Sequence, residues 1–113
     1  MSYTGTMLEY EISPAESAEL ILSGKARLLD VREPWEFARA NIAGRLLMPM
    51  GDVPSRAHQE LDPDEHLIVV CHLGQRSLAV TAWLRKEGFD HVQSMRGGIA
   101  AWSLSVDPSV PRY

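Results

Sequence analysis

The sequence contains one cysteine, and an arginine follows it after four intervening residues, in the stretch VVCHLGQRS over residues 69–77. A cysteine thiolate is a strong nucleophile, and a fixed positive charge beside it favours the thiolate over the thiol. Arg76 supplies that charge, and Gly74 lets the intervening backbone curl with a positive φ. The spacing predicts a loop whose backbone N–H groups point inward at an anion, with Cys71 as the nucleophile.

A lone cysteine after an apolar run also has an alternative interpretation as an inert packing residue, because free cysteines are among the most buried residue types. Three features favour the nucleophile. A polar loop follows Cys71, that loop contains Gly74 and Arg76, and a helix is predicted directly after it, from about Ser77. A helix that begins there directs its free N–H groups and the positive end of its dipole at the thiol.

The elements around Cys71 predict an α/β fold, because short apolar runs alternate with helix-like segments along the chain. The run LIVV (67–70) is continuously apolar, which is typical of a central parallel strand covered on both faces. Cys71 then lies at the carboxyl end of this strand, where open parallel sheets form binding crevices. Further strands are predicted over residues 8–12, 26–31, 46–48 and 91–95, and helices from Ser13, from Pro34, and over 54–61, 77–87 and 98–104.

Length and composition limit the possible functions. The 113 residues predict a single domain over 1–113, with 105–113 as an extended C-terminal tail. A net charge of −4 without any Lys/Arg block argues against nucleic-acid binding. One cysteine excludes an intramolecular disulfide, and the four histidines lack zinc-ligand spacing, so no metal or other cofactor is expected. No secretory signal or apolar run of transmembrane length is visible, so we expect no membrane partner and a cytoplasmic location.

Four motifs, in this order, resemble those of the single-domain rhodaneses, a family of thiosulfate and persulfide sulfurtransferases. They are LLDVREPWEF (28–37), NIAGRLLMPM (41–50), CHLGQRS (71–77) preceded by LIVV, and MRGGIAAW (95–102). The tail VDPSVPRY also resembles the ends of bacterial rhodaneses and of rhodanese domains fused to adenylating enzymes. The resemblance covers nearly the whole chain. It implies a five-stranded parallel sheet flanked by helices on both faces, with Cys71 in a cradle at the end of the fourth strand.

The resemblance also implies a sulfurtransferase that works by double displacement. The Cys71 thiolate takes the outer sulfur of thiosulfate or a persulfide donor, and the Cys71 persulfide then passes this sulfur to a thiol or another nucleophile. Inward N–H groups of residues 72–76 would stabilise the anionic terminal sulfur. The residues expected to bind the substrate are His72, Leu73, Gly74, Gln75, Arg76 and Ser77.

Two other functions compete with this one. The first is a sulfur-relay or binding module, which passes persulfide between a protein donor and a protein acceptor and turns over small donors poorly. The second is a phosphatase or arsenate reductase, which loop length disfavours. Cys71 to Arg76 is C-x4-R, whereas tyrosine phosphatases and the related cell-cycle phosphatases use C-x5-R, a loop wide enough for a phosphoryl group. The shorter loop makes a smaller cradle that matches a sulfur atom.

His72 departs from the family pattern, because many relatives have arginine at this position. Arg76 is then the only permanent cation of the loop, which favours a neutral donor or a protein-bound persulfide. His72 could equally be an exposed loop residue without a role. In the family's sheet order, Asp30 and Arg32 lie beside the Cys71 loop, where they either hold the loop or Arg76, or form a turn and helix-entry pair with each other. Core packing is predicted for Trp35, Trp83 and Trp102.

Overall fold

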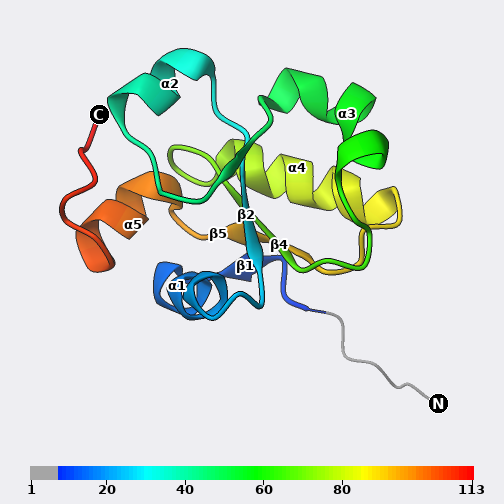
Figure 1. The fold of residues 1–113 in the computed structure, drawn as a ribbon, viewed down its shortest axis with the longest axis horizontal. Helices are drawn as coiled ribbons and strands as arrows, with labels where there is room; N and C mark the ends of the chain where they lie inside the picture. Colours follow the sequence, from blue (N-terminus) through cyan, green and yellow to red (C-terminus); the bar gives the residue numbers. More distant parts are fainter. Residues whose placement is uncertain (1–7) are drawn as a thin grey trace.

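Five parallel strands form one sheet between two layers of helices in the computed structural model, which describes residues 8–113 (Figure 1). The strand order is β1-β5-β4-β2-β3. The strands are β1 (Glu11–Ile12), β2 (Arg27–Asp30), β3 (Leu46–Leu47), β4 (Leu67–Val70) and β5 (Val92–Met95). The helices are α1 (Pro14–Leu22), α2 (Pro34–Arg39), the 3-10 turn η1 (Met50–Asp52), α3 (Val53–Glu60), α4 (Gln75–Lys86) and α5 (Gly98–Ser105). The predicted α/β fold with a five-stranded parallel sheet is confirmed.

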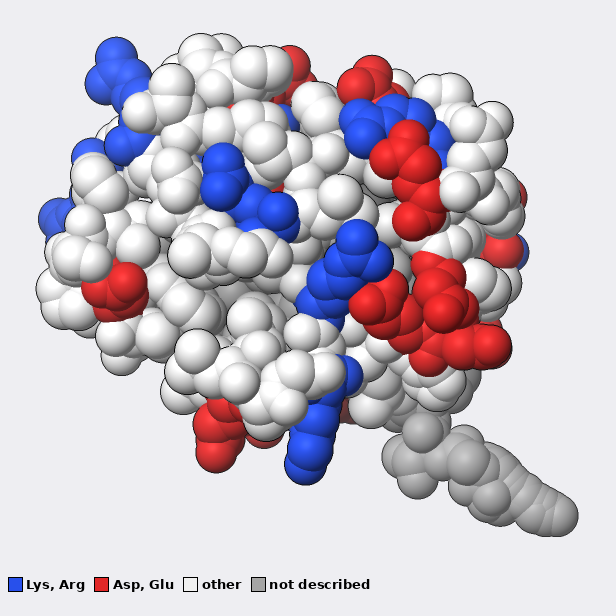
Figure 2. Space-filling model, in the orientation of Figure 1, with Lys and Arg blue, Asp and Glu red and all other residues white. Residues whose placement is uncertain are grey.

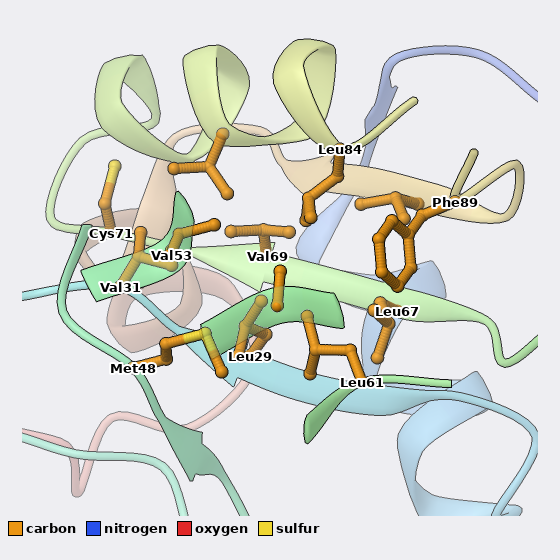
Figure 3. Close-up of a cluster of buried hydrophobic side chains, with 13 residues drawn as sticks. Leu29, Val31, Met48, Val53, Leu61, Leu67, Val69, Cys71, Leu84 and Phe89 are labelled. Atoms are coloured by element: carbon orange, nitrogen blue, oxygen red, sulfur yellow. The ribbon is translucent and has the colours of Figure 1, made fainter. Parts of the chain in front are cut away.

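Strand β4 lies in the middle of the sheet and contributes to a hydrophobic core on each face. Leu67 and Val69 belong to the core under α3 and α4, whereas Ile68 and Val70 belong to the core under α1 and α5. All four residues are fully buried, which explains why the strand is apolar at every position instead of at alternate ones. Figure 3 shows the first of these cores, with Cys71 at the opposite end of the cluster from Phe89.

The strand order determines which segments surround Cys71. In the sheet, β4 lies between β2 and β5. Because all strands are parallel, the segments that follow them emerge at the same edge of the sheet. The chain after β2 (residues 31–36) and the chain after β5 (residues 96–98) therefore flank the loop that begins at Cys71.

The first residue of α4 differs from the predicted one because the backbone conformation of a glycine decides where this helix begins. Helix α4 begins at Gln75, two residues before its predicted start, because Gly74 takes the N-cap position with φ of +109°.

Trp35 is 60% exposed on α2, so the prediction that it packs in the core was wrong. The short helix buries its neighbour Glu36 instead, which directs Trp35 to solvent. Trp102 is buried, and Trp83 is partly buried against the core.

The segment after α5 packs against the rest of the protein through a buried side chain and a hydrogen bond. Ser105 is the last residue of α5. Val110 is buried, and the Ser103 hydroxyl donates to its carbonyl oxygen at 2.6 Å. Tyr113 is half-buried. Of the residues predicted as an extended tail, 105–113, Ser105 thus belongs to α5, and Val110 is part of the core under α1 and α5.

Charged side chains of both signs are interspersed on the face shown in Figure 2. The ion pairs at the surface of the protein include Arg56 with Glu60 and Arg27 with Glu65. Basic side chains do not merge into one stripe on this face, in agreement with the net charge of −4. Within residues 8–113, the structure contains no helix with the length and apolarity needed to cross a bilayer.

Candidate active site

Cys71 is the first residue after β4, and it is only 1% exposed. Its Sγ accepts hydrogen bonds from the backbone N–H groups of Gly74 at 3.1 Å and Ser77 at 3.3 Å. We predicted donors among residues 72–76. Gly74 is one of these, while Ser77 lies outside that range because α4 begins early. The thiol is thus packed at the edge of the core, and its two N–H donors are placed to stabilise negative charge that develops on sulfur.

Ser77 connects the loop to the neighbouring strand. It lies in the first turn of α4, where backbone N–H groups have no partner within the helix. Its hydroxyl oxygen is 3.3 Å from Cys71 Sγ, 3.2 Å from the Gly74 carbonyl oxygen and 2.7 Å from Ser94 Oγ on β5. Both serines are fully buried. Sequence reasoning missed Ser94, whose only signal was a small polar residue inside a buried strand.

The amino end of α5 supports the Cys71 loop from the other side. The backbone N–H of Ile99 donates to the Cys71 carbonyl oxygen at 2.9 Å, and that of Ala100 donates to the His72 carbonyl oxygen at 3.1 Å. This close approach requires glycine at position 98, since a Cβ there would collide with both carbonyl oxygens, and its φ is +63°. The Gly97-Gly98 pair, predicted only as a tight turn, therefore brings a helix against the site.

Arg76 does not extend freely toward the sulfur. It forms a bidentate ion pair with Glu36 of α2, at 2.7 and 2.9 Å. The Glu36 side chain is 3% exposed. The hydrogen bonds from Arg76 lower the pKa of Glu36 to about 2, and those to Glu36 raise the pKa of Arg76. The loop's predicted permanent cation is therefore neutralised by a carboxylate that sequence reasoning missed, because Glu36 resembled an ordinary helix residue.

Asp30 and Arg32 pair with each other. The Arg32 guanidinium donates to both carboxylate oxygens of Asp30, at 2.9 and 2.7 Å, and both residues are buried. It also donates to the carbonyl oxygens of Glu36 at 3.3 Å and Ala40 at 2.7 Å. This geometry matches the turn and helix-entry pair. It also connects Arg32 to the backbone of the residue that binds Arg76.

The remaining loop side chains have different surroundings. Leu73 is 54% exposed, and Gln75 is also exposed. His72 is half-buried and stacks on the ring of Tyr113, with ring centroids 4.1 Å apart and an interplanar angle of 14°. His72 is thus a packed residue and not simply an exposed one. Tyr113, which is far away in sequence, was not predicted to lie at the site.

The Glu36–Arg76 pair makes stability depend on pH. Because the pKa of Glu36 is about 2 in the folded protein and 4.5 in its ordinary state, its stabilising effect is complete above pH 4.5 and is lost as the pH falls toward 2. We expect Glu36→Gln to lower the free energy of unfolding by up to about 3 kcal/mol at pH 7. The difference from wild type should shrink markedly by pH 3, as measured by urea denaturation.

The exposed Glu60, which pairs with Arg56 at 2.7 Å, supplies the control. Glu60→Gln should change the urea midpoint little at either pH, because exposed ion pairs contribute little to stability. An equal loss for Glu36→Gln at pH 7 and pH 3 would contradict the assigned charge state of Glu36.

Residues 13–105 match the family model described as "Rhodanese-like domain". The chain is 35% identical over 99 residues to "Putative sulfurtransferase YtwF" of Bacillus subtilis, covering 87% of this chain and 94% of that protein. It is 31% identical over 96 residues to "Thiosulfate sulfurtransferase GlpE" of Stutzerimonas stutzeri, covering 85% and 87%.

Some relatives are much longer. The chain is 38% identical over 96 residues to "Rhodanese-like/PpiC domain-containing protein 12, chloroplastic" of Arabidopsis thaliana, which covers 82% of this chain but only 32% of that protein. Among solved structures, it is similar to a rhodanese-related protein from Thermoplasma volcanium, with a TM-score of 0.81 and 28% identity. That match covers 93% of this chain and 100% of the other.

Proposed function

The chain belongs to the rhodanese-like domain family, and from this we propose that it is a sulfurtransferase that carries sulfur on Cys71 as a persulfide. The observation that carries the proposal is the pair of backbone N–H groups, from Gly74 and Ser77, directed at the Cys71 sulfur. Donors fixed in a buried site stabilise a developing anion without reorganising during the reaction. A single reactive thiol also suits a reducing compartment such as the cytoplasm.

The proposed reaction has two displacements and no net redox change. The Cys71 thiolate attacks the sulfane sulfur of thiosulfate or of a persulfide. The new Cys71 S–S bond forms as the donor's S–S bond breaks. The electron pair of the broken bond leaves with the donor remnant, which is sulfite or a thiolate. An acceptor nucleophile then attacks the terminal sulfur of the Cys71 persulfide. The S–S bond breaks, and its electron pair returns to the Cys71 thiolate.

A sulfur-relay module with protein partners is the second candidate, and two features favour it. Cys71 is buried, while Leu73 in the same loop is 54% exposed and Trp35 on α2 is 60% exposed. Arg76 is engaged by Glu36, so a small anionic donor meets a neutralised cation. A protein donor can bury such exposed apolar side chains as it delivers its persulfide.

Turnover distinguishes the two candidates. The protein is incubated with thiosulfate and cyanide, or with a small organic persulfide and a thiol, and the product is followed over many equivalents of protein. We expect repeated turnover for a sulfurtransferase. A single equivalent of sulfur transferred per protein would favour the relay, and no sulfur transfer from any of these small donors would contradict the sulfurtransferase.

Arg76→Ala tests whether the loop cation contacts the donor. Because Arg76 pairs with Glu36, we expect the substitution to lower kcat/KM by a similar factor for thiosulfate and for an uncharged persulfide. It should also destabilise the fold by about 2–3 kcal/mol, because the buried carboxylate of Glu36 loses its cationic partner. The loss is not larger because Arg76 is partly exposed, and solvent screens its interaction with Glu36. The matched control is Arg39→Ala on the exposed end of α2. A much larger loss for thiosulfate would show that Arg76 binds the donor directly.

A further inference from the structure

Tyr113 lies against the Cys71 loop, although it belongs to the segment after α5. Its hydroxyl donates to Glu36 Oε2 at 2.7 Å and accepts from Arg32 Nη1 at 3.0 Å. Its ring stacks on His72 and makes an edge-on contact with Trp35, with centroids 6.1 Å apart. One side chain thus contacts the loop itself and the residues that follow β2.

These contacts connect Tyr113 to both ends of the loop. His72, immediately after Cys71, is held by the ring stack. Arg76, near the other end, is held through Glu36, because Arg76 Nη2 and the Tyr113 hydroxyl share the same oxygen, Oε2, at 2.9 and 2.7 Å. The loop segment that supplies the Gly74 N–H lies between these two attachment points. Tyr113 therefore contacts residues on both sides of Gly74, His72 directly and Arg76 through Glu36.

Tyr113 is held in place by its neighbours, and its hydroxyl is in the protonation state that its hydrogen bonds require. Val110, three residues earlier, is buried and accepts a hydrogen bond from Ser103. Burial raises the pKa of Tyr113 to about 12, so its hydroxyl keeps the proton that it donates to Glu36 at physiological pH. The Arg32 guanidinium lies 5.7 Å from the ring centroid and is itself fixed by Asp30. Neither partner of the hydroxyl is free to rotate away.

We propose that Tyr113 is a positioning residue for sulfur transfer, which clamps both ends of the Cys71 loop so that the N–H groups of Gly74 and Ser77 stay directed at the sulfur. The kinetic part of this inference rests on the proposed sulfurtransferase function. Its structural part concerns the order of the cradle and holds independently of activity. Small displacements of preorganised donors reduce the stabilisation of a reacting anion.

The test measures amide hydrogen exchange by NMR and sulfur transfer in the same variants. We expect Tyr113→Ala to accelerate exchange of the Gly74 and Ser77 amides about tenfold or more relative to Val69 in β4, which serves as the internal reference for global opening. Sulfur transfer should fall about five- to tenfold, mainly in kcat. Tyr113→Phe keeps the stack on His72 and loses only the hydroxyl contacts, so it should lie between wild type and Tyr113→Ala.

The control is Tyr10→Ala, since Tyr10 is exposed and its ring lies under Arg85, 4.2 Å from the guanidinium carbon. It should leave the Gly74 and Ser77 exchange rates unchanged relative to Val69. Exchange in Tyr113→Ala that matches wild type, or that rises equally at Val69, would overturn the inference. If wild type transfers no sulfur, the proposed function fails, while the exchange rates still decide whether Tyr113 orders the cradle.

Discussion

Replacing Cys71 with serine is expected to abolish sulfur transfer, lowering kcat/KM by at least about 1,000-fold, because an alcohol at neutral pH is a poor nucleophile toward sulfane sulfur. The fold should be preserved. A serine oxygen can accept hydrogen bonds from the same N–H groups of Gly74 and Ser77. Because oxygen is no larger than sulfur, it fits in the same space. The measurement is steady-state turnover with thiosulfate and cyanide, beside urea denaturation of both proteins.

The stability of Cys71→Ser shows whether the loss of activity comes from the missing nucleophile or from unfolding. If Cys71→Ser has a urea midpoint close to that of wild type and still transfers no sulfur, the loss belongs to the nucleophile. Turnover by the serine variant at more than a tenth of the wild-type rate would exclude Cys71 as the sulfur carrier.

Replacing Gly98 with alanine is expected to lower the free energy of unfolding by about 3 kcal/mol or more. The new Cβ would collide with the carbonyl oxygens of Cys71 and His72, and the position has φ of +63°. Relieving the collision requires α5 to withdraw from the loop, which breaks the hydrogen bond from Ile99 to the Cys71 carbonyl oxygen. Sulfur transfer should therefore fall even at temperatures where the variant remains folded.

Gly24 provides a matched control for the effect of backbone conformation alone. It also has a positive φ, +76°, but a Cβ there would meet nothing within 4 Å. Gly24→Ala should cost only about 1–2 kcal/mol and leave transfer intact. Equal losses of stability for the two variants, in thermal or urea unfolding, would contradict the close approach of α5 to the Cys71 loop.

Local patterns predicted an α/β fold and the position of the cysteine, whereas the five-stranded parallel sheet was implied by the resemblance to rhodaneses. The continuous apolar run 67–70 identified a central strand, because a strand covered on both faces has no solvent-facing position to carry a polar residue. A glycine and a helix start after Cys71 then located the loop. The start of α4 was predicted two residues late, since Gly74 supplies an N-cap without a side-chain signal.

The partners of the loop could not be predicted in the same way, because they come from distant parts of the chain. Glu36 is 40 residues from Arg76, and Tyr113 is 77 residues from Glu36. No helical or strand periodicity reports such pairings. The prediction therefore included the positive charge of Arg76 but lacked the buried carboxylate of Glu36 that pairs with it. Trp35 was misplaced for the same reason, since pairing decides which face of α2 is buried.

The central claim is that Cys71 carries sulfur as a persulfide, and intact-protein mass spectrometry tests it most directly. Wild type and Cys71→Ser are each incubated with thiosulfate, and separately with an organic persulfide, then freed of donor and weighed without reductant. Wild type should gain the mass of one sulfur atom from at least one donor, and an acceptor thiol should remove that sulfur. Cys71→Ser should gain none. An unchanged wild-type mass with both donors, or an equal gain in Cys71→Ser, would contradict the claim.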